Sequence, residues 1–453
     1  MTSPVERTTH DDDLFIRMDR AFGVPVLSQA IWRLTEPLDA EELDRIGRRL
    51  QQTPLSRVLH RSRVPLARDH WTAAEGAAGR THLDPPLADD EILEWIESAA
   101  DVRFDLDDGP VWELRAAELR SGGGLVTMCS SHAVGDGWLG GLSILQATAD
   151  ADDTSAYHPA APTLTDDLRD ATRQAISIGG NLAALARDSW TSRRRPVEQA
   201  DVAPVTSQST AAPPAPSEAE MARETPIRTP LAIVSIPGEE WRATVTEAEG
   251  TTTALFIAIV IGLIVDAGRA DWTDRVRVSV PMSLRDEAGD TRANSTTGLT
   301  LDVPAEWSRD HDLRSIRRLA KEAYQGAGTR SSRLLRLQPL MQALPDRAVS
   351  ALSTNAATPL ALASSGGAVD PLFSGLGKPS RVGTFASRAT TQGVSRERLA
   401  RLRGGLAAWF HDTGETTTLA VSGLDPNAFP TSVELGTRVQ KECARWGLTP
   451  QNW

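Results

Sequence analysis

The stretch from residue 193 to residue 230 constrains the fold of this chain more than any other feature. It is rich in Pro, Ala, Ser, Thr and Glu, contains no aromatic residue and has few branched aliphatic ones. Such a segment cannot bury enough apolar surface to offset its conformational entropy, so we expect a flexible crossover. The chain has 453 residues, more than one hydrophobic core usually serves. We therefore expect two lobes, one on each side of the crossover.

The residue pattern divides the chain into three parts. Residues 1–160 are expected to form the first lobe, and residues 231–453 the second. Residues 161–230 are expected to connect them through an amphipathic helix at 164–190 and the crossover. The two lobes share a plan, because QAIWRLTEPLDAEEL and LAIVSIPGEEW both read as a strand, a proline, two acidic residues and a helix.

Strand and helix signals alternate in both lobes. In the first, the spacing predicts a strand at 29–34, a helix at 39–50 and a hairpin of 111–119 with 125–131 around the turn SGGG. In the second, it predicts strands near 275–285 and 298–304, a hairpin within 405–424 and a last helix at 433–446. We therefore predict an α/β (α+β) fold with mixed sheets.

Charge and composition exclude several classes of protein. The chain has 48 basic and 60 acidic residues, a formal charge of −12, and no basic stripe apart from a short run near Arg193. We therefore expect no nucleic-acid partner. The two cysteines, Cys129 and Cys443, can supply neither a disulfide framework nor a cysteine zinc site. We expect no metal and no redox chemistry.

The apolar runs are short. The first fifteen residues are polar and acidic and lack the basic and then apolar order of a secretory signal. The longest apolar run, 254–265, is well short of the roughly 20 residues that span a bilayer. We expect a cytoplasmic protein without an integral membrane segment, in which this run forms a buried helix.

The segment SHAVGDG, residues 131–137, carries the chemistry. His132, Asp136 and Gly137 match the pattern H-x-x-x-D-G. His132 follows a predicted strand, and the glycines after it let the chain turn sharply, which leaves the imidazole free at a lobe boundary. A neutral imidazole, with an ordinary pKa of about 6.5, can take a proton from a hydroxyl or amine as that group attacks an acyl carbon. The alternative is a buried histidine with a structural role.

Asp136 has two possible roles. A catalytic triad would require its carboxylate to orient the imidazole of His132, but it lies four residues on, beyond a glycine. We favour a structural role, with Arg285 holding Asp136 through a bidentate ion pair that bridges the two halves. A solvated loop arginine is the alternative for Arg285.

Cys129 lies three residues before His132, which raises the possibility of a nucleophilic thiol. Side chains alternate along a strand, so Leu125, Thr127, Cys129 and Ser131 share one face, and Val126, Met128, Ser130 and His132 share the other. A small buried cysteine is therefore the preferred interpretation.

SHAVGDG resembles the H-H-x-x-x-D-G motif of condensation domains and of bacterial wax ester synthase/diacylglycerol acyltransferases. The first His of that motif is Ser131 here, and the second, which is the catalytic one in these families, is matched by His132. Four further segments follow in the order of the wax ester synthase-like pattern: residues 251–265, VPMSLR at 280–285, Asn294 within RANSTTGLTLDVP, and STNAATP at 353–359. The resemblance covers nearly the whole chain.

Residues 373–379, FSGLGKP, resemble the D-F-G-W-G-K-P segment of plant BAHD acyltransferases, without its Asp and Trp. These resemblances imply two chloramphenicol-acetyltransferase-like lobes in a V-shaped pseudodimer. They also imply a channel between the lobes with His132 at its middle, and Asp136 placed against Arg285.

The implied reaction moves an acyl group from a thioester, on coenzyme A or on the phosphopantetheine of a carrier protein, to an alcohol or amine. We expect no bound cofactor, because the thioester is a substrate. Asn294, Ser295 and Thr296 are candidates to stabilise the oxyanion, and Ser131 and Trp138 are expected along the substrate channel. The acidic chain offers no visible basic mouth for the phosphates of coenzyme A, which slightly favours a carrier protein.

Three functions stay open at this point. The first is ester formation with an alcohol acceptor, and the second is amide formation by a free-standing condensation enzyme. The third is a non-catalytic scaffold that binds a carrier protein, against which the joint retention of His132, Asp136, Gly137 and Arg285 argues. We expect the protein to act as a monomer.

Overall fold

The structure is a computed structural model of the chain. It describes residues 5–76, 78–149, 156–192, 225–285, 290–327, 338–340, 342–344 and 360–453. Most of the predicted crossover and the STNAATP segment lie outside these residues.

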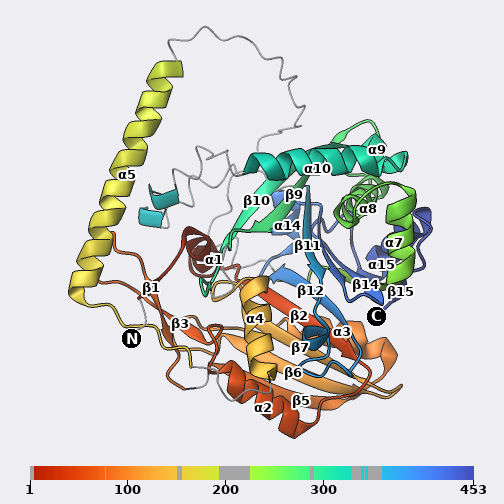
Figure 1. Ribbon diagram of the computed structural model, residues 1–453, viewed down its shortest axis with the longest axis horizontal. Helices are drawn as coiled ribbons and strands as arrows, with labels where there is room; N and C mark the ends of the chain where they lie inside the picture. The colour runs from red at the N-terminus through yellow and green to blue at the C-terminus, as the bar shows by residue number, and fades with distance from the viewer. Residues whose placement is uncertain are drawn as a thin grey trace.

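The first lobe is built on a five-stranded sheet with the strand order β12-β2-β7-β6-β5. Its strands are β2 (Val26–Leu34), β5 (Gly79–Leu87), β6 (Trp112–Leu119), β7 (Gly124–Ser131) and β12 (Gly383–Thr391). Helices α2 (Ala40–Leu50) and α4 (Gly137–Thr148) pack on one face, and η1 (Asp89–Glu91) leads into α3 (Ile92–Ala99) on the other (Figure 1). A small sheet of β1 (Glu6–Arg7), β4 (His70–Ala73) and β3 (Arg57–His60) lies beside α1 (His10–Arg20).

The predicted hairpin of the first lobe is present as β6 and β7. Its turn needs glycine, because Gly122 and Gly123 have φ values of 102° and 82°. A Cβ on Gly123 would also lie 2.3 Å from the carbonyl oxygen of Leu34. Asp39 caps α2 by accepting a hydrogen bond from the Glu42 amide at 2.8 Å.

The second lobe is built on a seven-stranded sheet with the order β10-β9-β11-β13-β14-β8-β15. Its strands are β8 (Leu231–Pro237), β9 (Arg275–Ser283), β10 (Thr296–Pro304), β11 (Ala361–Ala368), β13 (Leu406–Asp412), β14 (Thr416–Gly423) and β15 (Gln451–Asn452). Its helices are α7 (Gly238–Glu247), α8 (Thr252–Asp266), α9 (Ala305–Arg309), α10 (Leu313–Ala327) and α15 (Ser432–Arg445). Two short helices of the same segment pack on the first lobe: α13 (Pro371–Ser374) lies against α4 and β12, and α14 (Arg396–Leu402) lies against Val24 and Phe22. The predicted mixed α/β architecture in two lobes is confirmed.

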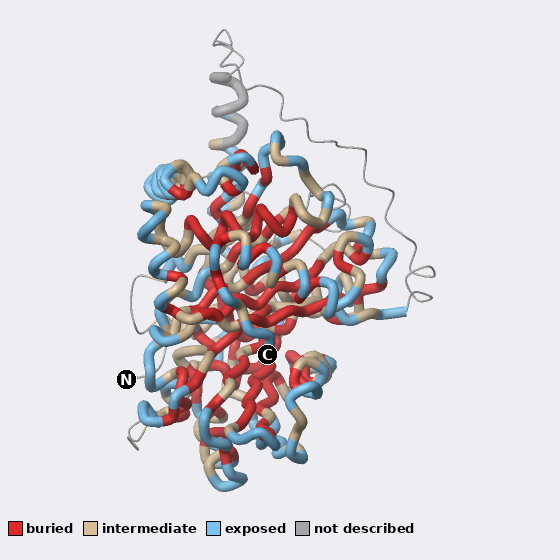
Figure 2. The backbone as a smooth tube through the Cα atoms, turned by 90° about the vertical axis from the view of Figure 1, so that its right-hand side faces the viewer, coloured by how far each residue is buried: buried red, intermediate tan, exposed pale blue. Residues whose placement is uncertain are grey.

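Helix α8 holds the core of the second lobe together. It is the apolar run of the sequence, and every residue from Ala254 to Ile264 is buried. No single helix in the described ranges is long and apolar enough to cross a membrane, and only the pair α7 and α8, bent by 92°, reaches that length and hydropathy together. In Figure 2 the buried residues run through the interior of both lobes, and exposed residues line the rim.

Helix α5 (Leu164–Ser192) stands apart from both sheets (Figure 1). It is the linker helix that the sequence predicts. Two ion pairs fix its beginning to the first lobe, from Asp167 to Arg7 at 2.6 Å and from Asp170 to Arg68 at 2.7 Å.

Strand β12 departs from the predicted division of the chain. It belongs to the segment 231–453, yet it pairs antiparallel with β2, with Phe385 opposite Trp32, and so completes the sheet of the first lobe. The boundary at residue 231 therefore does not separate the two sheets. The physical reason is that pairing with β12 satisfies the backbone groups of β2, which would otherwise form a sheet edge.

Phe385 joins the two lobes through β12. Its ring centroid lies 5.1 Å from that of Trp32 on β2 and 4.6 Å from that of His411 on β13. Phe373 makes an edge contact with the ring of Phe385, and the two ring centroids lie 4.8 Å apart. One buried aromatic side chain thus packs on residues of both sheets.

We predict that Phe385→Ala lowers the free energy of unfolding by about 3–5 kcal/mol, because a buried ring is replaced by a cavity between the sheets. Chemical denaturation monitored by circular dichroism measures this loss. Val382→Ala, in the exposed residue just before the strand, is the control and should change the value by less than about 0.5 kcal/mol. Equal effects of the two substitutions would show that β12 does not hold the lobes together.

Candidate functional site

His132 lies in a tight turn between β7 and α4. Its backbone amide donates to the carbonyl of Val26 at 2.9 Å, which continues the pairing of β7 with β2. Ser131 shapes the turn, because its hydroxyl accepts a hydrogen bond from the Ala133 amide at 3.3 Å. Ser131 therefore supports the turn that presents the imidazole, and its place along a substrate channel stays a prediction.

The two glycines of the motif differ in what they contribute. A Cβ on Gly135 would lie 3.1 to 3.2 Å from the side chains of Leu139 and Leu55, so close packing favours glycine there. Gly137 begins α4, has no left-handed backbone angle, and a Cβ on it would meet no atom within 4 Å. The sharp turn expected at Gly137 is therefore not what the structure shows, and the space beside it is open.

Asn294 of the second lobe holds the imidazole. Its Oδ1 lies 3.1 Å from His132 Nδ1. Its Nδ2 is surrounded by acceptors, the Asp12 carboxylate at 2.9 Å and the carbonyls of His132 and Ala133 at 3.0 and 3.2 Å. The amide nitrogen must face these three oxygens, so the atom that faces the imidazole is an oxygen.

This arrangement assigns the tautomer of His132. Because Asn294 Oδ1 can only accept a hydrogen bond, His132 Nδ1 carries the proton and donates it. In the neutral ring Nε2 then has a free lone pair. Nε2 makes no hydrogen bond to any residue that the structure describes and is not among the fully buried polar atoms of that part of the chain. The basic nitrogen is therefore open to a reacting group.

Asp12 of α1 orients Asn294 in turn. Its Oδ1 accepts from both the backbone and the side-chain amide of Asn294 at 2.9 Å, and its Oδ2 accepts from Thr9 N and from Trp71 Nε1 at 2.8 and 3.2 Å. Burial raises the pKa of Asp12, and these donors oppose that shift. Since both oxygens only accept, the site fits the carboxylate anion.

The sequence analysis missed Asp12, although a signal was present. Thr9 and Asp12 form the capping box of α1, with Thr9 as N-cap and Asp12 at the third helical position. The pattern T-x-x-D at the start of an amphipathic segment indicates such a box. The same helix provides Phe15, whose ring stacks on His132 with centroids 4.0 Å apart and planes inclined by 19°.

The surroundings keep His132 neutral. Burial lowers the pKa of His132 below its ordinary value of 6.5, while Asp136, Asn294 and Asp12 act in the opposite direction. The downward shift leaves the imidazole unprotonated near pH 7, the state that a general base requires. The hydrogen bond that assigns the tautomer and the lowered pKa of His132 therefore both indicate a neutral ring with a lone pair on Nε2.

Asp136 and Arg285 form the expected contact between the lobes. Arg285 Nη1 lies 2.5 Å from Asp136 Oδ2, and both side chains are buried. The contact is not bidentate as predicted, because Asp136 Oδ1 accepts from the Leu139 amide of α4 and Oδ2 also accepts from the Ser295 amide. Arg285 Nη2 instead donates to the carbonyls of Arg292 and Ala293.

Asp136 does not act as a triad carboxylate in this arrangement. Its oxygens are occupied by Arg285, Leu139 and Ser295, and none of its hydrogen bonds reaches His132. It caps α4 and ties this helix to the loop of the second lobe. The structural role that the sequence favours thus agrees with its contacts.

The remaining predicted residues lie around this ion pair. Trp138 stacks against the guanidinium of Arg285, with Cζ 4.8 Å from the ring centroid, so its contact is with the ion pair. Thr296 begins β10 and donates its backbone amide to Asp11 at 3.2 Å. Ser295 is buried, and its hydroxyl has no hydrogen-bond partner among the described residues.

These contacts change the candidates for an oxyanion donor. Asn294 cannot serve, because its amide hydrogens are taken by Asp12 and the two carbonyls. The hydroxyls of Ser295 and Thr296 both lack a hydrogen-bond partner among the described residues, but the Ser295 oxygen is fully buried, whereas Thr296 is only half-buried. The Thr296 hydroxyl is therefore the donor of this loop that stays accessible.

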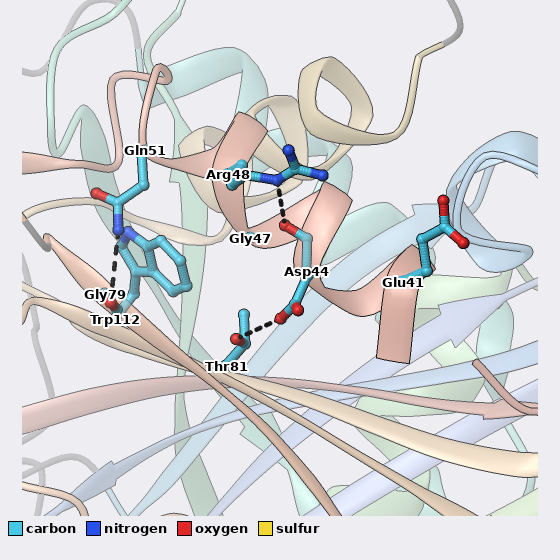
Figure 3. Close-up of a pocket in the computed structure, with 8 residues that line it drawn as sticks. All are labelled: Glu41, Asp44, Gly47, Arg48, Gln51, Gly79, Thr81 and Trp112. Carbon is cyan, nitrogen blue, oxygen red and sulfur yellow. Dashed lines mark hydrogen bonds between the residues drawn. The ribbon is translucent and has the colours of Figure 1, made fainter. Parts of the chain in front are cut away.

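Other features of the structure lie away from His132. A cavity of about 470 Å³ lies between α2 and the strands β5 and β6, and Figure 3 shows Asp44, Gln51, Thr81 and Trp112 among the residues around it. None of the predicted site residues lines it. Within the described ranges, no group of three or more His, Cys, Asp or Glu side chains could hold a metal ion.

The fold and this geometry can be compared with known proteins. No protein-family model matches the chain, and the comparison with curated proteins gives no match. Among solved structures, the first condensation domain of the CDA synthetase is similar over 97% of this chain and 95% of that one, with 15% sequence identity and a TM-score of 0.58. The chain has the condensation-domain fold.

Two further structures share the condensation-domain fold with this chain. The wax ester synthase/diacylglycerol acyltransferase from Marinobacter aquaeolei has 13% identity and a TM-score of 0.53, covering 97% of this chain and 98% of that one. The starter condensation domain of rhizomide synthetase, solved in complex with an acyl-coenzyme A, has 12% identity and a TM-score of 0.53, covering 98% and 94%. The predicted resemblance to this superfamily is confirmed at the level of the fold.

Cys129 points away from the imidazole, as strand alternation predicts. Its Sγ lies 3.5 Å from the carbonyl of Ala99 at the end of α3, whereas Met128 packs in the core with α4. Burial raises the pKa of the Cys129 thiol to about 12. Burial raises the pKa of Cys443 to about 12 as well, so neither thiol forms a thiolate near neutral pH.

We predict that iodoacetamide at pH 8 alkylates both cysteines at least about 100-fold more slowly in the folded protein than in guanidinium, because the thiolate is the reacting species. Peptide mass spectrometry measures the rate at each position separately. Rapid labelling of Cys129 in the folded protein would contradict the burial argument and restore a thiol mechanism as an alternative.

Proposed function

We propose that the protein is an acyltransferase in which His132 acts as the general base. The observation that carries the proposal is the open Nε2 of His132, whose lone pair is assigned by the hydrogen bond from Nδ1 to Asn294. The condensation-domain fold supports it, although a shared fold alone does not establish an activity. The proposed reaction is therefore argued from the residues around His132.

The chemistry follows from the needs of acyl transfer. The acceptor hydroxyl gives its proton to His132 Nε2 as its oxygen bonds to the carbonyl carbon of the thioester. The tetrahedral oxyanion needs a hydrogen-bond donor, for which we propose the hydroxyl of Thr296. When the C–S bond breaks, the imidazolium returns the proton to the leaving sulfur, and the products are an ester and a thiol.

We propose an alcohol as acceptor and an acyl thioester of coenzyme A or of a carrier protein as donor. The wax ester synthase/diacylglycerol acyltransferase with the same fold supports the ester product, and the rhizomide synthetase domain in complex with an acyl-coenzyme A supports this type of donor. An amine acceptor would use the same proton transfer and would give an amide. The two products are outcomes of one experiment.

We expect the protein to release the thiol and form a new acyl product when a panel of acyl-coenzyme A and acyl-carrier-protein thioesters is mixed with alcohols and amines. Mass spectrometry identifies the ester or amide, and the intact mass of the carrier reports the loss of its acyl group. His132→Ala should lower the turnover about 100-fold or more, because the proton acceptor is removed.

Two variants complete this experiment. Cys129→Ala, three residues earlier on the opposite face of the strand, should keep most of the activity. His132→Gln preserves the approximate shape of the side chain, so it should be folded and inactive. If folded His132 variants retain more than about a tenth of the turnover, well above what loss of a general base leaves, the role of His132 is wrong.

A further inference from the structure

A second cavity, of about 310 Å³, lies where α3, β12 and residues 226–229 meet. Arg388 of β12 forms part of its wall. In the sheet, Arg388 stands opposite Gln29, which stands opposite Cys129. Since Cys129 contacts the end of α3, the cavity belongs to the face of the sheet that α3 covers, and it has no part in the reaction proposed above.

Arg388 is a buried cation held in one orientation. Only 4% of the residue is exposed. Its Nε donates to Gln29 Oε1 at 2.8 Å, and Gln29 is fixed because its Nε2 donates to the Ile96 carbonyl and to the Thr127 hydroxyl. A single hydrogen bond on Nε leaves the two terminal nitrogens free to form a fork.

The terminal nitrogens of Arg388 have no protein partner in the described part of the chain. No hydrogen bond involves Nη1 or Nη2, no carboxylate lies within 4.0 Å, and neither nitrogen is among the fully buried unpaired atoms. They therefore keep access to space, and the cavity that Arg388 lines is that space. An unpaired buried charge is costly unless a ligand or water meets it.

The acidic groups near the cavity are already engaged. Asp101 and Glu94 pair with Arg228. Glu97 accepts a hydrogen bond from the Ser432 hydroxyl at 2.9 Å, and burial raises its pKa. The exposed Arg103 adds a second positive charge to the lining. The cavity thus presents a guanidinium fork that is not neutralised by the carboxylates around it.

We propose that this cavity binds an oxyanion, a carboxylate or phosphoryl group, on the two terminal nitrogens of Arg388. A guanidinium fork matches two oxygens of such a group. The volume suits a small molecule or the end of a larger one. The inference is independent of the proposed acyl transfer, because it uses neither His132 nor Asn294.

Titration calorimetry on the whole protein tests the proposal, with sodium phosphate and sodium acetate as separate probes at constant ionic strength. We expect saturable binding of at least one probe, and the tighter one identifies the class of oxyanion. Arg388→Gln should weaken that binding by about ten-fold or more, since charge-assisted hydrogen bonds are lost. Arg228→Gln is the matched control, because Arg228 also lines the cavity but is already paired with Glu94 and Asp101. The affinity of this variant for the probe should lie within about three-fold of the wild-type affinity.

Two further variants keep the test decisive if Arg388→Gln does not fold. Arg388→Lys retains the charge without the fork and should bind more weakly than the wild type. Glu97→Gln removes a lining carboxylate that forms no ion pair with a described residue, and this variant should bind the oxyanion more tightly. Absence of saturable binding to the wild type, or equal affinities of the wild type and the Arg388 variants, would overturn the proposal.

Discussion

The side-chain amide of Asn294 is the contact on which the rest of the site depends. It joins three parts of the chain that are far apart in sequence: α1 through Asp12, the turn after β7 through His132 and Ala133, and the start of β10 through its own backbone. Its Oδ1 accepts a hydrogen bond from the imidazole, and its Nδ2 donates only to oxygen acceptors. The imidazole is therefore oriented by a network that would have to move as a whole.

The ion pair between Asp136 and Arg285 and the crossing of β12 fix the lobes around this network. Both side chains of the pair are buried, and a buried pair of charges costs desolvation that its attraction offsets only with good geometry. Here the pair is supported by the Leu139 and Ser295 amides and by the ring of Trp138. Its benefit is that the loop carrying Asn294 is held against the turn carrying His132.

Local signals in the sequence predicted much of the fold and part of the site. The hairpin of β6 and β7, the buried helix α8 and the motif at His132 depend on residues close in sequence, where periodicity and turn chemistry suffice. The crossing of β12 could not be predicted in this way, because a strand signal does not specify a partner some 350 residues away. The role of Asp12 was hidden for the same reason, since its partner Asn294 is distant and its local pattern indicates only a helix cap.

The central claim is that His132 is neutral near pH 7, with its proton on Nδ1 and its lone pair on Nε2. Nitrogen-15 NMR of protein labelled at histidine measures this directly, with His132→Gln used to assign the signal among the eight histidines. The account predicts an Nδ1-protonated neutral ring at pH 7 that gains a second proton only below its ordinary pKa of about 6.5. A neutral ring protonated on Nε2, or an imidazolium at pH 7, would contradict it.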